Sequence, residues 1–95
     1  MKIDFTVSKK IDFPTLCIIL KEIIPYCISI KGYFQTPISV IFVKMEEEQI
    51  ITEHISESVP QNDINLFTAV GDNKHALIAI LTDVKQRYKI IDFEY

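Results

Sequence analysis

Hydrophobic and polar residues alternate at the start of the chain. Ile3, Phe5 and Val7 are separated by the polar residues Asp4 and Thr6. A period of two residues is typical of a β-strand with one buried face. The spacing then becomes helical, and the apolar stripe contains Phe13, Leu16, Cys17, Leu20, Ile23 and Ile24, with Ile18 and Ile19 widening it. The pattern predicts a strand followed by a helix that is more buried than an ordinary surface helix.

Polar and proline residues mark the limits of this helix. Asp12 stands where an N-cap is expected, and Pro14 is tolerated in a first turn. Pro25 ends the helical stretch, because proline lacks the N–H that a helix interior needs. A second strand is predicted directly afterwards, with Ile28, Ile30 and Phe34 on one side and Ser29, Lys31 and Tyr33 on the other.

The middle of the chain is typical of a hairpin. Residues 35–37 form a short connection, and residues 38–45 are the most continuously apolar strand candidate. Residues 40–43 place apolar side chains on both faces of this strand. We therefore expect it to lie centrally in the sheet.

Residues 46–59 allow two interpretations. Ile51, Ile55 and Val59 recur every four residues, which suits a helix. The β-branched run at residues 50–52 suits a strand. We favour a strand that returns from a Glu-rich turn, with the helix as the alternative.

The second half repeats the logic of the first. After a loop over residues 56–63, an alternating pattern predicts a strand over 64–69, and Gly71-Asp72-Asn73 forms a turn whose last two residues are candidate N-caps. A helix follows over roughly 73–88, with an inward stripe of Leu77, Ile80, Leu81, Val84 and Tyr88. Ile90, Ile91 and Phe93 predict a final strand.

Two strand–helix–strand passages in one short chain predict an α+β fold. The element order favours a ferredoxin-like (split β-α-β) two-layer sandwich with an additional β-hairpin strand and with the helices on one sheet face. A chain of 95 residues has the length of one domain, so we expect residues 1–95 to form a single α+β domain. This fold hosts many unrelated functions and implies none of them.

The charge balance argues against nucleic-acid binding. Thirteen acidic residues against ten basic ones give a net charge of −3. Nucleic-acid binders usually present a basic face, because neutralising phosphates drives their affinity. The basic residues here are scattered, so we expect no nucleic-acid partner.

Cysteine usage and the N-terminal pattern indicate a cytoplasmic protein. Cys17 and Cys27 are the only cysteines and form no CxxC motif. The first residues resemble a strand rather than a secretory signal, and the longest apolar run, residues 16–20, is too short to span a bilayer. We expect reduced thiols and no membrane partner, with a disulfide between the two cysteines as the alternative.

One turn has features of an anion-binding site. Gly71, Asn73 and Lys74 lie where a predicted strand meets a helix N-terminus, and free N–H groups with Lys74 and His75 would attract a phosphate. The simpler interpretation is that Gly71 turns the chain and Asp72 caps the helix. Asp72 would also repel an anion, and the turn contains neither a P-loop nor a GxGxxG motif.

The histidines and cysteines form no recognisable catalytic or metal motif. His54 lies between Glu53 and Glu57, but this spacing matches no metal-binding template. Cys17 lies within an apolar stripe, where a thiol behaves as a small hydrophobic group, and Cys27 lacks the signature of a thiol enzyme. We therefore predict a non-enzyme without a metal or cofactor.

The densest charge feature is an acidic group formed by Glu46, Glu47, Glu48, Glu53 and Glu57. Such a group can steer a basic partner through its electric field. The favoured interpretation is that it solvates a hairpin tip and discourages edge-to-edge strand pairing.

Function is predicted from these features together. The first hypothesis is a small non-enzymatic protein-binding module, such as a regulator, inhibitor or immunity-type protein, acting through a sheet face or the acidic hairpin. Its candidate contact residues are Glu46, Glu47, Glu48, Glu53 and Tyr33, and Tyr26, Phe34 and Tyr95 are further aromatic anchors if exposed. The alternative is a small-ligand-sensing regulatory domain that binds an anion at the Gly71 turn.

A homodimer is also expected. In the predicted sandwich the helices cover one sheet face only, so the other face meets water or a partner. The strand at 38–45 directs either Ile41 and Val43, or Val40 and Phe42, away from the helices. We expect two copies to pair through this face or through an exposed strand edge.

Overall fold

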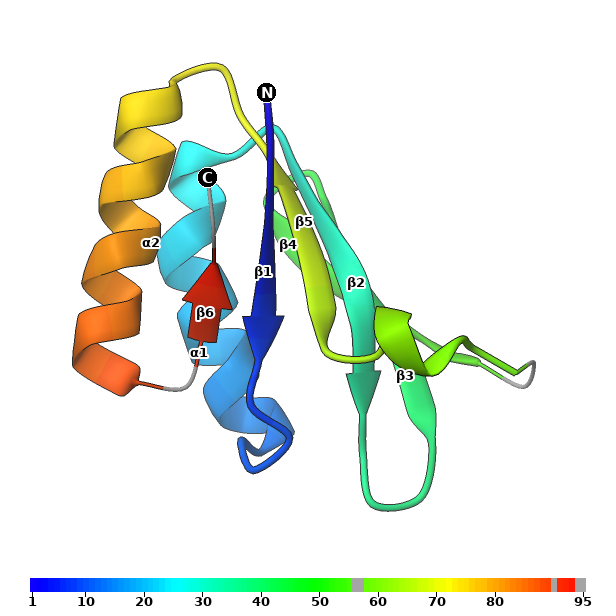
Figure 1. Cartoon of the computed structure of the whole chain (residues 1–95). Coiled ribbons are helices and arrows are strands. Elements are labelled where there is room, and N and C mark those ends of the chain that lie inside the picture. The colour runs from blue at the N-terminus through cyan, green and yellow to red at the C-terminus, as the bar shows by residue number, and fades with distance from the viewer. Residues whose placement is uncertain (56–57, 90, 94–95) are drawn as a thin grey trace.

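The computed structural model describes residues 1–55, 58–89 and 91–93. This part of the chain forms six strands and two α-helices (Figure 1): β1 (Lys2–Val7), α1 (Phe13–Ile23), β2 (Ser29–Gln35), β3 (Val40–Glu46), β4 (Gln49–Ile55), β5 (Leu66–Val70), α2 (Lys74–Tyr88) and β6 (Ile91–Phe93). Two 3-10 turns, η1 (Ile24–Tyr26) and η2 (Gln61–Asp63), lie between them. The predicted α+β class is confirmed.

The strands form one antiparallel sheet in the order β4-β3-β2-β5-β1-β6. Figure 1 shows both helices on the same side of this sheet. We call the side that faces the helices the inner face and the opposite side the outer face. The hairpin β3–β4 continues the sheet beyond β2, at the edge opposite β6.

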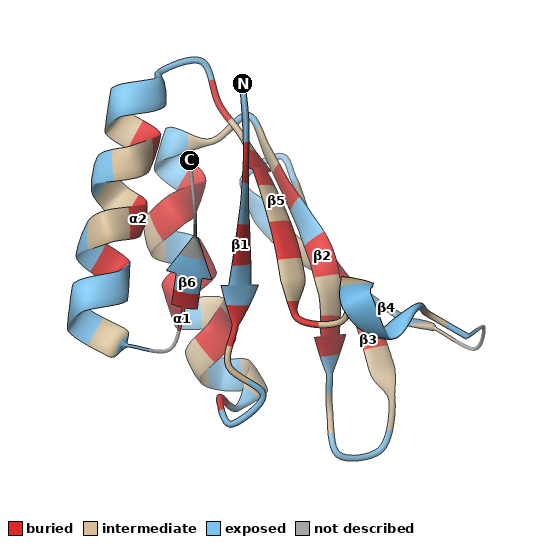
Figure 2. Ribbon diagram, viewed as in Figure 1, coloured by how far each residue is buried: buried red, intermediate tan, exposed pale blue. Residues whose placement is uncertain are grey.

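The N-terminal strand and helix follow their sequence pattern closely. Ile3, Phe5 and Val7 of β1 are buried, while the residues between them are exposed (Figure 2). Asp12 caps α1, because its Oδ1 accepts a hydrogen bond of 2.8 Å from the N–H of Thr15. The helix ends at Ile23, and Pro25 lies in the following turn η1.

Two apolar residues expected inside are exposed. Ile18 was predicted to widen the buried stripe of α1, but 54% of it is exposed. At 100° per residue it points away from the buried residues Leu16 and Leu20, so the stripe is narrower than predicted. Ile28, which precedes β2, is 60% exposed, and its N–H donates to the carbonyl of Val70.

The hairpin resolves the ambiguous segment in favour of a strand. Residues 49–55 pair antiparallel with residues 40–46, and Glu47 and Glu48 form the two-residue turn between them with φ angles of 50° and 64°. The predicted central position of β3 is wrong, because β2 and β5 occupy the middle of the sheet. The outward apolar residues of β3 lie on the uncovered outer face. The part of the predicted loop at residues 56–57 lies outside the described residues.

The core lies between the inner face and the helices, as the buried positions in Figure 2 show. The rings of Phe5 and Phe67 stack there with centroids 5.5 Å apart. Gly32 makes room for this stack, because a Cβ at that position would lie 2.6 Å from the Phe67 ring. On α2, Asn73 caps the helix, and the buried residues are Leu77, Leu81 and Val84, with Ile80 and Tyr88 partly buried.

Candidate functional site

The outer face is the surface of the sheet that the helices leave uncovered. Along β3 the side chains of Ile41 and Val43 are buried on the inner face, so Val40 and Phe42 point outward. Of the two pairs that the sequence offered as pointing away from the helices, Val40 and Phe42 are therefore the correct pair. The register places Tyr33 of β2 directly beside Phe42. The antiparallel pairing therefore gathers an aromatic pair on this face.

The aromatic pair borders a shallow hollow. The rings of Tyr33 and Phe42 lie 5.2 Å apart between centroids, with their planes tilted by 47°. The hollow beside them has a volume of about 270 Å³ and is lined by Lys31, Gly32, Tyr33, Phe42, Asp63, Leu66 and Thr68. Most of this lining comes from β2 and β5, and Asp63 comes from η2.

The charges around the hollow are unevenly compensated. Lys31 and Lys44 stand directly opposite one another on β2 and β3, an arrangement that destabilises a sheet unless the charges are neutralised. Lys44 is neutralised, because its Nζ lies 2.8 Å from Glu46 Oε1 and 3.9 Å from Glu53 Oε1, and the contact with Glu46 raises the pKa of Lys44. Among the described residues Lys31 has no acidic partner within 4 Å.

The acid that lines the hollow is likewise without a basic partner in the described chain. Asp63 is the last residue of η2, and the next residue, Ile64, forms an isolated β-bridge with the backbone of Tyr33. No ion pair joins Asp63 to Lys31 or to another described base, although both residues line the same hollow. The hollow therefore combines an apolar floor with one uncompensated base and one uncompensated acid.

The acidic group predicted from the sequence is divided by the fold. Glu47 and Glu48 form the tip of the β3–β4 turn, whereas Glu46 and Glu53 are held against Lys44. Glu57 lies outside the described residues. The register thus brings Glu53 into the same row as Tyr33 and Phe42, and leaves the tip acids apart from the hollow.

The Gly71 turn is occupied by contacts of its own. The N–H of Gly71 donates to the carbonyl of Met1, and its carbonyl accepts from the Met1 amino group, both at 3.1 Å. Asn73 Oδ1 accepts from the N–H of Ala76 at 3.0 Å, and Lys74 is exposed on the first turn of α2. Gly71 has no positive φ, and a Cβ there would lie 2.9 Å from the carbonyl oxygen of Tyr26. Glycine at this position serves close packing.

The histidine and cysteine side chains stand apart from one another. His54 is exposed on β4, and no group of three or more metal-ligating side chains occurs within residues 1–55, 58–89 and 91–93. Cys17 and Cys27 are free thiols and partly buried. Burial raises the pKa of both, that of Cys27 to about 11, so both favour the unreactive thiol form.

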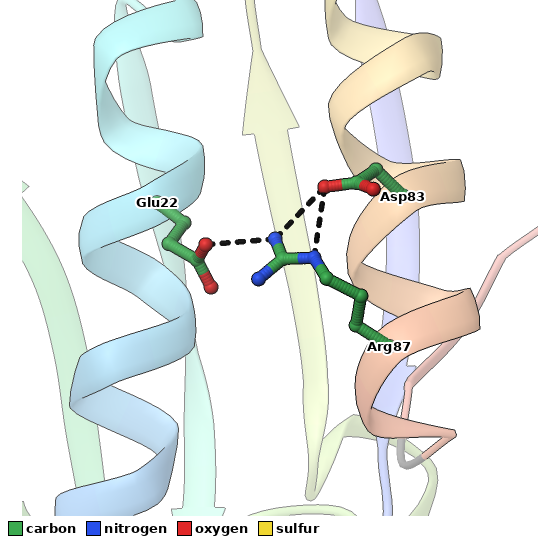
Figure 3. Close-up of polar contacts among 3 residues, drawn as sticks. All are labelled: Glu22, Asp83 and Arg87. Carbon is green, nitrogen blue, oxygen red and sulfur yellow. Dashed lines mark hydrogen bonds and ion pairs between the residues drawn. The ribbon is translucent and has the colours of Figure 1, made fainter.

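A charged cluster links the two helices on the far side of the molecule from the outer face. Arg87 Nη2 lies 2.7 Å from Glu22 Oε1 on α1, and Arg87 Nε donates to Asp83 Oδ2 at 2.9 Å (Figure 3). Both carboxylates raise the pKa of Arg87, the hydrogen bond to Glu22 contributing most. The cluster ties α2 to α1. The four-residue spacing of Asp83 and Arg87 is typical of a pair on one helix, but the contact with Glu22 depends on how the two helices pack.

Sequence reasoning identified Tyr33 and Glu53 but missed other members of this surface. Lys31, Asp63 and Leu66 meet only because β2, β5 and η2 converge, and their spacing along the chain carries no signal. Phe42 was visible as an outward alternative. The hollow is thus a product of strand register.

Comparisons with protein-family models, with curated proteins and with solved structures find no match to this chain. In addition, none of the helices in the described residues is long and apolar enough to cross a membrane.

Proposed function

We propose that this protein is a non-enzymatic protein-binding module, a small regulator, inhibitor or immunity-type protein that docks through its outer sheet face. The observation that carries this proposal is the Tyr33–Phe42 pair beside a hollow with uncompensated Lys31 and Asp63. Aromatic anchors within a rim of charge are typical of protein interfaces. The partner is a protein, either another copy in a homodimer or a different chain.

The composition of the hollow supports binding over catalysis. Tyr33, Phe42 and Leu66 form its apolar part, and the hydroxyl of Thr68 on its lining already donates to Asp4 Oδ1 at 2.7 Å. General acid–base catalysis needs a base within hydrogen-bonding reach of a reacting proton and with a pKa near the working pH. A shallow hollow with aromatic side chains and separated charges suits recognition of another surface.

We also propose that the fold is ferredoxin-like. The four strands β2-β5-β1-β6 have the order and antiparallel pairing of a split β-α-β sandwich, with α1 joining β1 to β2 and α2 joining β5 to β6. The hairpin β3–β4 is then an insertion that lengthens the sheet. The cytoplasmic location predicted from the cysteines is consistent with two free thiols.

The alternative function, anion sensing at the Gly71 turn, has less support. The N–H of Gly71 is engaged by Met1, and the side chain of Asn73 caps its own helix. A phosphate there would have to displace these contacts or rely on Lys74 and the first turn of α2.

Site-specific photocrosslinking tests the proposed function. A photoreactive phenylalanine analogue at Tyr33, expressed in the native cells, is expected to crosslink to protein in a discrete band. The same analogue at Tyr26, an exposed tyrosine on η1, is the matched control and should give no such band. A blank lane at Tyr33, or equal bands at both positions, would reject the outer face as the docking surface.

A further inference from the structure

We infer that the partner of the outer face is a second copy of this chain, packed face to face so that Lys31 of each copy meets Asp63 of the other. The inference rests on the proposed function of the outer face and names the occupant. Three observations carry it: the uncovered aromatic pair, the uncompensated base and the uncompensated acid, all at one hollow.

The charges of the hollow are complementary to themselves. Lys31 and Asp63 line it together, but they form no ion pair with each other in the described chain. A two-fold axis lying in the interface, midway between the two residues, places the lysine of one copy opposite the aspartate of the other. The contact occurs twice about the axis, so the dimer gains two Lys31–Asp63 ion pairs that the single chain does not form. Self-complementarity of this kind is what a two-fold interface requires.

The pairing of Lys31 with Lys44 also supports the inference. Lys31 faces Lys44 across the β2–β3 pair, and Lys44 has its own acids in Glu46 and Glu53. These acids neutralise Lys44 only, so the charge of Lys31 is left without an acid among the described residues of the single chain. Approach of Asp63 from a second copy removes this imbalance without breaking the contacts of Lys44.

The apolar floor supplies the rest of the interface. Tyr33 lines the same hollow as Lys31 and Asp63, and its backbone forms a β-bridge with Ile64, the residue after Asp63, so an axis between Lys31 and Asp63 passes close to Tyr33. The aromatic pairs of the two copies then pack against one another near the axis. Two sheets packed face to face in this way bury apolar side chains that are partly exposed in each copy.

A charge exchange tests the inference. In sedimentation velocity measured from low to high micromolar concentration, the wild-type chain is expected to dimerise. Lys31→Glu and Asp63→Lys should each weaken self-association by at least about tenfold, because like charges then face each other twice. An equimolar mixture of the two variants should dimerise to within about threefold of the wild type, because both contacts are again of opposite sign.

Folding defects cannot produce this result, because two damaged chains do not repair one another on mixing. Lys10→Glu, at an exposed position on the β1–α1 loop, is the matched control and should leave the dimer unchanged. A wild-type monomer at high micromolar concentration overturns the inference, and so does a mixture that stays monomeric. Either result leaves the photocrosslinking at Tyr33 to decide the broader function, since a crosslink to a different protein is still possible there.

Discussion

Asn65 joins three strands at the point where the chain enters β5. It is 3% exposed, and its φ of 63° lies in the left-handed region. Its N–H donates to the carbonyl of Tyr33 at 2.6 Å, and its carbonyl accepts from the N–H of Val7 at 2.9 Å. Its side-chain Oδ1 accepts from the N–H of Gln35 at 3.3 Å. One buried residue therefore fixes β1, β2 and β5 relative to one another, and asparagine suits it because this residue tolerates positive φ.

Substitution of Asn65 should separate its backbone and side-chain roles. Asn65→Ala forces an ordinary residue into the left-handed region and removes the side-chain acceptor, at a cost of about 2–3 kcal/mol in the free energy of unfolding. Asn65→Gly keeps the backbone conformation and should cost about 1–2 kcal/mol, from the lost hydrogen bond and the added freedom of the unfolded chain. Urea denaturation of both variants measures the difference, and equal costs would contradict the role of φ.

The buried thiol of Cys27 makes the stability of the fold depend on pH in a predictable direction. Burial raises its pKa to about 11, above the value of about 8.5 for an exposed thiol. A raised folded pKa means that the thiol stabilises the fold fully below the unfolded value, and that this stabilisation is lost as pH rises through 11. The stability advantage of wild type over Cys27→Ala should therefore shrink between pH 8.5 and pH 11. Thiol alkylation in a Cys17→Ala background should also be slow at pH 8.5 and accelerate on unfolding, and equal rates in both states would contradict the shift.

The helices and strands differ in how completely their sequences specify them. The main helix stripes and the N-cap Asp12 were predictable, because capping and a 3.6-residue period are local properties. For the second helix the sequence left Asp72 and Asn73 as candidate caps and favoured Asp72 at the turn, whereas Asn73 is the residue that caps it. The strand at 49–55 was ambiguous because Ile51 and Ile55 fit a helical period as well, and only pairing with β3 decides between the two. The exposure of Ile18 shows a similar limit, since hydrophobicity alone does not give the direction of a side chain around a helix.

Matched alanine substitutions on α1 test this assignment. Leu20 is fully buried, so Leu20→Ala should lower the free energy of unfolding by about 2–5 kcal/mol through lost burial and the resulting cavity. Ile18→Ala, on the solvent side of the same helix, should change it by less than about 0.5 kcal/mol. Chemical denaturation measures both, and a similar loss for the two variants would show that the buried face of α1 is wrongly assigned.

At the scale of the whole molecule, element order and class could be predicted, while the place of the hairpin β3–β4 in the sheet and the candidate site could not. The sheet order β4-β3-β2-β5-β1-β6 depends on which strands pair, and β3 was wrongly expected in the middle. The hollow depends on the same information, because Lys31, Asp63 and Leu66 come from three elements. Local patterns specify helices and turns, but a surface assembled from distant residues requires the register.

The fold as a whole should need neither metal nor disulfide. Its core is a continuous apolar cluster from both helices and the inner face, and both cysteines are free thiols. The melting temperature is therefore expected to be unchanged by EDTA and by a thiol reductant, measured by circular dichroism in each. A clear fall with either reagent would contradict this prediction.

The position of β1 in the sheet also sets the order in which the protein can assemble during synthesis. Its two neighbours are β5 and β6, which leave the ribosome long after it, whereas the β2–β3 and β3–β4 pairs join strands that are close in sequence. The meander β2–β3–β4 can form early, because local pairings require little loop closure. The first strand remains without a partner until β5 emerges, and a nascent chain in this state exposes Ile3, Phe5 and Val7, a segment that a holding chaperone would recognise.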